Sequence, residues 1–271
     1  MHRIESTRPC VALAPYVRAF AQRRAQFPAP LVEACPARLE TVLNFELGEP
    51  IVINPEGRAS FSSASTAVIG PMAHTRASVS LFGRVDSFAI FFQPGGFAEL
   101  FGVPIGKLVD CAHEADDVMG TPARHLWNQL GEATQFPDRV ALTERFLLGC
   151  LSEVRPSSWA ISTANSFLAH PGHPRMVELA RSVGISVRQF ERLFLRETGA
   201  TPKLFARIAR FQCALDAKVR NPGCPWLKIA HAVGYFDQMH MVHDFRKLGG
   251  DSPQRLVESL GDMRPEALAG N

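Results

Sequence analysis

Six side chains in the last hundred residues can hydrogen-bond to the edges of nucleic-acid bases. They form two groups about fifty positions apart: Arg188, Gln189 and Arg192, then Gln238, His240 and His243. An arginine can donate two parallel hydrogen bonds to guanine and a glutamine can pair with adenine, while a histidine donates according to its protonation state. These types predict direct base contacts. The alternative for each is a polar side chain on a solvated helix face.

Basic residues near these groups suit a second role, contact with phosphates. The candidates are Lys203, Arg207, Lys228, Arg246 and Lys247. Phosphate contacts supply much of the affinity for DNA and carry no sequence information. Residues 160–260 hold 14 lysines and arginines against 8 aspartates and glutamates, a net charge of +6, whereas the other residues hold 15 against 18. This asymmetry favours a polyanionic partner for the C-terminal part alone.

An internal repeat relates the two groups. Glu178–Pro202 aligns with Lys228–Pro253 at an offset of fifty before the turn and fifty-one after it. The matched pairs are Ala180 and Ala230, Val183 and Val233, Gly184 and Gly234, Phe194 and Phe245, Gly199 and Gly250, and Pro202 and Pro253. The extra residue falls at the turn, where insertion is best tolerated.

Each copy of the repeat predicts a helix-turn-helix. The first helix ends at Gly184 or Gly234, where glycine accepts a positive φ. Ser186 and Asp237 are suitable N-caps for the second helix. Apolar side chains four residues apart then face the core, Phe190 with Phe194 and Met241 with Phe245. One such copy could be any helical pair joined by a glycine turn, but two matched copies favour a groove-binding unit.

The second copy resembles the signature of AraC/XylS transcription regulators. Gly234–Met241, Asp244–Arg246 and Ser252–Pro253 resemble Gly-[Phe/Tyr]-x-Asp-Gln-x-His followed by Phe-Arg/Lys and a closing Pro. Ile229-Ala230 and Gly199–Pro202 agree with it, and the match covers roughly residues 165–258. The resemblance implies that a long helix, Pro202–Val219, joins two units that read successive major grooves on one face of DNA.

Two features depart from that family pattern. Asn221–Trp226 occupies the connector before the second unit, and its prolines and tryptophan predict a stiff, partly packed loop. Met239 stands where many members have a small polar residue.

The N-terminal part is predicted to be β-rich. Apolar, β-branched runs between turn residues indicate strands at Leu39–Leu47, Ile51–Asn54, Ala67–Ile69, Val79–Phe82 and Val85–Phe92. A short helix is expected at Phe97–Phe101, and helical spacing returns from Asp116, in Ala123–Leu130 and Val140–Leu151. The predicted fold class is therefore α+β, with an N-terminal β-rich, barrel-like domain with helices and a C-terminal all-α domain of two helix-turn-helix units.

The N-terminal part also resembles the half-barrel sensor domain found in a subset of the same family. Leu39–Phe45, Phe92–Phe97 and Phe101–Pro104 carry this resemblance. It implies a sensing role and names no ligand. Arg38, Glu40 and Asn44 are candidate effector contacts, although strand alternation equally places some of them at the surface. The alternative is a domain that serves only dimerisation or protein contact, with Leu142–Leu151 as its apolar interface.

The sequence predicts a sensor or dimerisation domain with a helical tail at 1–155, a DNA-binding domain at 156–262 beginning near a linker at Arg155–Ser158, and a tail at 263–271. The candidate partners are double-stranded DNA, a small-molecule effector, RNA polymerase and a second copy of the chain, with no membrane. The expected role is a transcription regulator, and activation is the sign that we assign to it.

Enzymatic classes find little support in the sequence. The N-terminal histidines, His2, His74, His113 and His125, include no His-x-His pair of the kind a cupin-type metal site uses. No Gly-x-Ser-x-Gly elbow occurs, and the six cysteines have no metal-binding spacing. We therefore expect no catalytic residues, metal or cofactor. Unpaired cysteines and the lack of a long apolar run predict a cytoplasmic protein.

Overall fold

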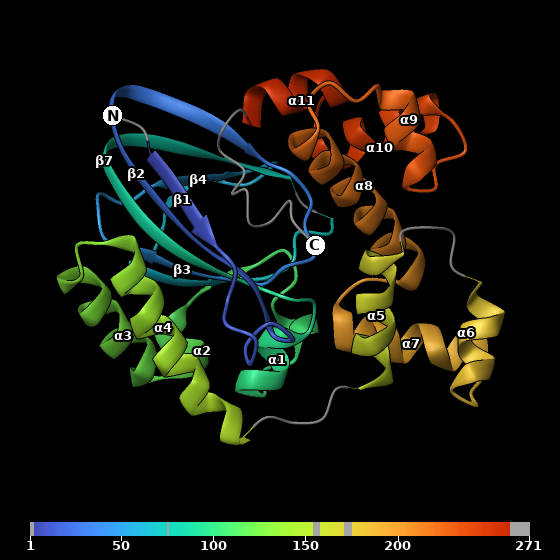
Figure 1. The fold of residues 1–271 in the computed structure, drawn as a ribbon, viewed down its shortest axis with the longest axis horizontal. Helices are drawn as coiled ribbons and strands as arrows, with labels where there is room; N and C mark the ends of the chain where they lie inside the picture. Colours follow the sequence, from blue (N-terminus) through green and yellow to red (C-terminus); the bar gives the residue numbers. More distant parts are fainter. Residues whose placement is uncertain (1–2, 75, 154–157, 171–174, 261–271) are drawn as a thin grey trace.

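The computed structural model describes residues 3–74, 76–153, 158–170 and 175–260. Its N-terminal half is an antiparallel sheet covered by helices, and its C-terminal half is helical (Figure 1). The predicted fold class is confirmed. None of the helices within these residues is long and apolar enough to cross a membrane.

Eight strands of the described residues form one antiparallel sheet. They are β1 (Arg3–Thr7), β2 (Val17–Cys35), β3 (Val42–Glu46), β4 (Val52–Pro55), β5 (Phe61–Ser62), β6 (Thr66–Ile69), β7 (Ala77–Phe92) and β8 (Ala112–Glu114). Their order is β1-β2-β7-β3-β6-β8, and β4 pairs with both β5 and β7. The two long strands, β2 and β7, pair along most of their length and form the centre of the sheet.

The long strands differ from the sequence prediction in two ways. Val79–Phe82 and Val85–Phe92 are one strand, because Gly83 takes a φ of +69° without ending it. The strand β2 was not predicted, and it contains two residues that disfavour a strand, Pro28 and Pro30. Those prolines fall where the pairing register with β7 shifts, and β1 pairs only with Phe20–Arg24, so neither proline must donate to a ladder on that side.

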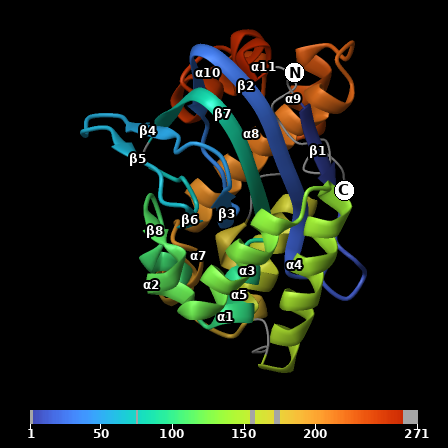
Figure 2. The same cartoon turned by 90° about the vertical axis from the view of Figure 1, so that its left-hand side faces the viewer.

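Helices pack against one face of the sheet (Figure 2). They are α1 (Gly96–Phe101), α2 (Ala115–Met119), α3 (Thr121–Glu132) and α4 (Phe136–Cys150), with short 3₁₀ turns η1 (Ile105–Lys107) and η2 (Leu151–Glu153). Their apolar faces share a core with Phe20, Phe45 and Phe88. The predicted helix at Phe97–Phe101 and the later helical pattern are confirmed.

A buried ion pair fastens α4 to the sheet. Arg139 is 2% exposed, and its Nη1 donates to Asp86 Oδ1 at 2.6 Å and to Gln22 Oε1 at 2.7 Å. Burial acts to raise the pKa of Asp86, but the hydrogen bonds and charge of Arg139, with the charge of Arg24, outweigh it and hold that pKa below its usual value.

The C-terminal half contains α5 (Trp159–Ala169), α6 (Met176–Ser182), α7 (Val187–Thr198), α8 (Pro202–Arg220), α9 (Trp226–Ala232), α10 (Gln238–Gly249) and α11 (Pro253–Leu260). The predicted connecting helix Pro202–Val219 is confirmed as α8, which is one residue longer. The predicted linker start falls mostly on residues 155–157, outside the described ranges, and Ser158 caps α5 by accepting a hydrogen bond from Ile161 N. The predicted domain boundaries remain predictions.

Candidate nucleic-acid interface

The first helix-turn-helix consists of α6 and α7. Gly184, with a φ of +70°, closes the turn between them, and Ser186 caps α7 by accepting from Gln189 N at 3.3 Å. Phe190 and Phe194 are fully buried. Phe190 packs against Trp159 of α5, and Phe194 packs against Phe167 of α5 and Phe205 of α8. One face of α7 is therefore fixed in the core, and the opposite face is free for a partner.

The second unit, α9 and α10, repeats this construction. Gly234 has a φ of +84°, and Asp237 caps α10 by accepting from His240 N at 2.6 Å. Met241 and Phe245 are fully buried. The predicted turns, caps and core positions of both units are confirmed, and Figure 1 shows the units near the two ends of α8, on the side away from the sheet.

The base-reading candidates lie mainly on the outer faces of these helices. Arg188, Gln189 and Arg192 on α7 are exposed, and so are Gln238 and His243 on α10. His240 is half-buried because its ring packs edge-on against Tyr235, with 5.3 Å between ring centroids. Within the described ranges, Arg188 and Arg192 have no ion-pair partner. Sequence reasoning missed Arg196, which extends the same stripe one turn further and is 69% exposed beside Glu197.

Four of the five phosphate candidates are exposed as well: Lys203, Lys228, Arg246 and Lys247. The fifth, Arg207 of α8, has an internal partner that the sequence did not reveal. Its Nε donates to Asp244 Oδ1 at 2.6 Å, and Asp244 is only 1% exposed. Arg207 thus fastens α10 to α8, and its contact with phosphate stays a prediction.

The same junction holds an aromatic side chain beneath an arginine. Tyr235 is 4% exposed, and the guanidinium of Arg210 lies 5.6 Å from its ring centroid. Burial, followed by the charge of Asp244, raises the pKa of Tyr235 above its usual range, so the phenol stays protonated. A desolvated cation over a ring adds stability beyond area burial. The second unit is therefore held rigidly on the connecting helix.

The connector between α8 and α9 is packed, as its sequence predicts. Lys218 Nζ donates to the carbonyl of Cys224 at 2.9 Å and lies 5.2 Å from the Trp226 ring. That ring packs edge-on against Phe245 of α10. The loop therefore leaves the second unit little freedom to swing.

The connecting helix sets the separation of the units. At about 1.5 Å per residue, the 19 residues of α8 span roughly 28 Å. That length is similar to the roughly 34 Å of one turn of B-form DNA. The arrangement can therefore present two helices to neighbouring grooves of one duplex.

The N-terminal half docks on the connecting helix and on both units. Ala37 N donates to Leu248 O at the end of α10, and Leu39 N donates to Gln212 Oε1 on α8. The turn η1 packs against α7 of the first unit. Because both units touch the same half of the molecule, a change in this docking would reach both of them.

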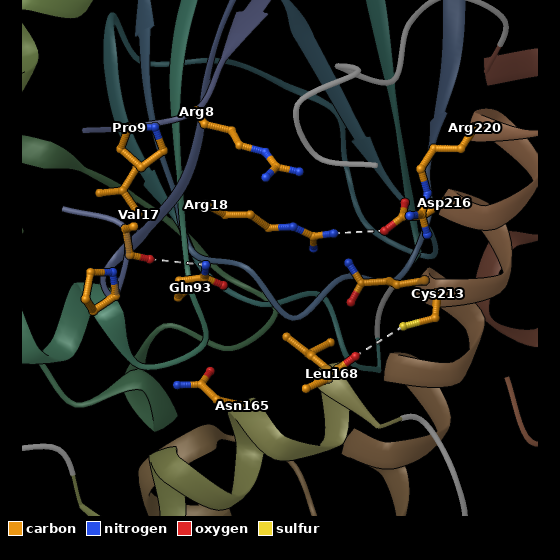
Figure 3. A pocket seen from close by; sticks show the side chains of 14 residues that line it. Arg8, Pro9, Val17, Arg18, Gln93, Asn165, Leu168, Cys213, Asp216 and Arg220 are labelled. Carbon is orange, nitrogen blue, oxygen red and sulfur yellow. Dashed lines mark hydrogen bonds and ion pairs between the residues drawn. The ribbon is translucent and has the colours of Figure 1, made fainter. Parts of the chain in front are cut away.

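A pocket of about 520 Å³ lies at this junction (Figure 3). Arg8 and Arg18 reach into it from the sheet side, and Asp216 and Arg220 from α8. Arg18 forms ion pairs with Glu40 and, through Nη2 at 2.8 Å, with Asp216 Oδ2. Burial acts to lower the pKa of Arg18, but these two carboxylates outweigh it and raise that pKa. Arg18 therefore remains charged inside the junction.

The three effector candidates are placed beside this pocket or away from it. Arg38, Glu40 and Asn44 are not among the residues that line it. Glu40, 3% exposed, accepts from Gln212 Nε2 at 2.7 Å and pairs with Arg18, and both of these residues line the pocket. Asn44 instead donates to Glu46 Oε1 on the sheet at 2.7 Å. Effector contacts by these three residues stay predictions.

The metal-ligating and thiol side chains of the described part of the chain are dispersed. Among these residues, no group of three or more His, Cys, Asp or Glu side chains is arranged to hold a metal ion. The cysteines at 10, 35, 111, 150, 213 and 224 are free thiols. Burial, the largest cause, raises the pKa of Cys213 beside the pocket to about 11, which leaves the thiol protonated and unreactive.

Comparison with known protein families agrees with this geometry. Residues 179–259 match the family model of a helix-turn-helix domain of the AraC type. These residues therefore form a helix-turn-helix domain of the AraC type. Residues 5–114 match a second model, a domain of unknown function (DUF6597). No curated protein sequence shows significant similarity to the chain.

Solved structures share the fold of both halves of the chain. ToxT from Vibrio cholerae superposes with a TM-score of 0.55 at 10% identity, covering 95% of this chain and 99% of ToxT. A ToxT structure with a bound unsaturated fatty acid gives 0.55 at 9% identity, over 88% of this chain and 95% of that one. Another, bound to (E)-4-(8-methylnaphthalen-1-yl)but-3-enoic acid, gives 0.52 at 10% identity, over 96% and 99%. The likeness shows a shared fold.

Proposed function

We propose that the protein is a sequence-specific DNA-binding transcription regulator whose two helix-turn-helix units read neighbouring major grooves. One observation carries this proposal: the buried faces of α7 and α10 are fixed in the core while their polar faces stay exposed at opposite ends of one rigid helix. A row of hydrogen-bond donors on the outer face of the second helix of such a unit is what base readout requires.

The exposed residues divide between two tasks. Arg188 and Arg192 donate to guanine, Gln238 pairs with adenine, and Gln189, His240 and His243 complete the readout. Lys203, Lys228, Arg246 and Lys247 bind phosphates and supply affinity that depends on salt but not on sequence. Arg207 joins this second group only if it reaches a phosphate while it holds Asp244.

Selection of bound duplexes from a random library tests this proposal. Purified protein should recover a motif with two clusters about one helical turn apart. The Arg188→Ala/Arg192→Ala double variant should lose one cluster and keep the other. Arg145→Ala, which removes one exposed guanidinium on α4, is the control for loss of surface charge and should recover the full motif. If the wild-type protein recovers no motif, the proposed function is wrong.

Modulation by a small molecule is the second part of the proposal. The pocket between the halves has a volume within the roughly 300–1,000 Å³ typical of ligand sites, and residues from both halves line it. Three guanidinium groups, from Arg8, Arg18 and Arg220, favour an anionic effector. ToxT, which shares the fold, has been crystallised with an unsaturated fatty acid and with a butenoic acid. An effector here would compete with Asp216 for Arg18 and so alter docking on α8.

A thermal-shift screen separates a sensor from a domain that only mediates contacts. A ligand that binds the native pocket raises the melting temperature, and Arg220→Ala should weaken that response. If a panel of carboxylates and phosphates shifts nothing while the protein forms a dimer in solution, the contact-only function is favoured. Homodimerisation, contact with RNA polymerase and activation stay predictions. Of the proposed dimer segment Leu142–Leu151, Leu147 is buried in its own core and Leu148 is 41% exposed.

A further inference from the structure

The internal repeat pairs each position of the second recognition helix with a counterpart in the first. With an offset of fifty-one after the turn, Met239 occupies the position of Arg188, and His243 that of Arg192. The structure supports this pairing, since the caps Ser186 and Asp237 also correspond. Equivalent outward positions therefore carry a guanidinium in one unit and a thioether in the other.

The one residue added in the second unit is also apolar. Tyr235 corresponds to Ile185 and Asp237 to Ser186, so Phe236 has no counterpart. It lies directly before the N-cap of α10 and is 86% exposed, while Met239 in the first turn is 69% exposed. Two large apolar side chains thus flank Gln238 at the end of the helix that enters a groove.

The protein's own fold gives these two side chains no packing role. Met241 and Phe245 already fill the core side of α10, and Tyr235 fills the turn. Exposed apolar groups that lie together on a functional face commonly mark a contact surface. In the major groove, the one apolar group that a base pair presents is the 5-methyl of thymine.

We propose that the second unit reads thymine through contacts of Met239 and Phe236 with its 5-methyl groups, while the first unit reads guanine. The inference rests on the proposed function and assigns a base chemistry to one half of the operator. Gln238, between the two apolar residues, donates to an adjacent adenine. The operator therefore has a box with guanines and a box with thymines, in an order fixed by the chain.

Replacement of thymine by deoxyuridine tests this proposal, because it removes only the methyl group. Each thymine of the selected operator is replaced in turn, and binding is measured by fluorescence anisotropy. Loss of one buried methyl should weaken wild-type binding roughly fourfold. Both apolar side chains are exposed, so Met239→Ala and Phe236→Ala should keep the wild-type melting temperature. At the thymine that the removed side chain contacts, each variant should bind the thymine operator and the deoxyuridine operator with equal affinity. Phe82→Ala, an exposed phenylalanine of β7, is the control and should keep the difference.

The outcomes separate the two proposals. A methyl effect confined to one box and erased by the variants supports the inference. If deoxyuridine changes nothing while specific binding persists, the inference is wrong and the proposed function stands. If wild type shows no preference for any selected site over random duplex, both are wrong. A methyl effect that persists in both variants also overturns the assignment to these residues.

Discussion

The buried ion pairs of the N-terminal half and the two recognition helices use arginine in opposite ways. In the N-terminal half, Arg23 pairs with Glu33 and Arg139 with Asp86, and both arginines are largely buried. On α7 and α10, Arg188, Arg192 and Arg246 are exposed, and the described residues offer none of them an ion-pair partner. Charge is structural in these buried pairs and displayed on the two recognition helices, and the C-terminal half also has a structural arginine in Arg207. A count of charges along the chain cannot make that distinction, but the partners of each guanidinium can.

The largest effect expected from this comparison follows loss of Arg139. Arg139→Ala leaves Asp86 buried without its main partner, and breaking a buried pair in this way costs about 3–5 kcal/mol of folding free energy. Urea unfolding of the full chain measures it. Arg139→Met with Asp86→Leu should recover much of the loss, because an apolar pair needs no counter-charge. A single variant within 1 kcal/mol of wild type would mean that the pair is not structural.

A smaller, pH-dependent effect is expected at Glu46, which is 4% exposed on β3. Burial raises the pKa of Glu46 to about 7, against an ordinary value of 4.5. The pKa of Glu46 is higher in the folded state than in the unfolded chain. The contribution of Glu46 to folding stability is therefore most favourable below about pH 4.5 and becomes less favourable as the pH rises toward 7. Glu46→Gln should therefore raise the melting temperature more at pH 8 than at pH 5. Parallel melting profiles of the two proteins would contradict the shifted pKa.

On the displayed side, Arg192→Ala should leave the fold intact. Exposed substitutions of this kind change stability by less than about 0.5 kcal/mol. Binding to the selected operator should weaken by roughly 1–3 kcal/mol, and discrimination at one guanine should relax. Gel-shift titration against operators altered at single positions measures both. Unchanged site discrimination would remove Arg192 from the readout.

The smallest effect is expected from a phosphate contact. Lys247→Ala should weaken binding to all duplexes alike and reduce the slope of log affinity against log salt by about one. Titrations at several salt concentrations, on operator and on random duplex, measure it. A loss confined to the operator would reassign Lys247 to base readout.

The sequence predicts the C-terminal half well because local signals agree with each other there. Gly184 and Gly234, two N-caps and two buried apolar pairs recur at one spacing, and tertiary contacts reinforce them. The N-terminal half is harder, since its longest strand contains Pro28 and Pro30, whose effect depends on which neighbour is paired at that point. The Arg207–Asp244 and Arg18–Asp216 pairs join residues 37 and 198 positions apart, and no local pattern announces them.

The fixed length of α8 has a consequence for the spacing of the two proposed DNA boxes. The helix α8 is unbroken, and Arg207, Lys218 and the buried core fasten the units to it. It therefore holds the two units at a fixed distance and a fixed rotation. Adding about half a turn of duplex, roughly five base pairs, between the boxes would rotate the second box to the far side of the helix axis. The proposed two-groove readout therefore predicts that the spacer between the boxes varies in base identity and keeps a constant length.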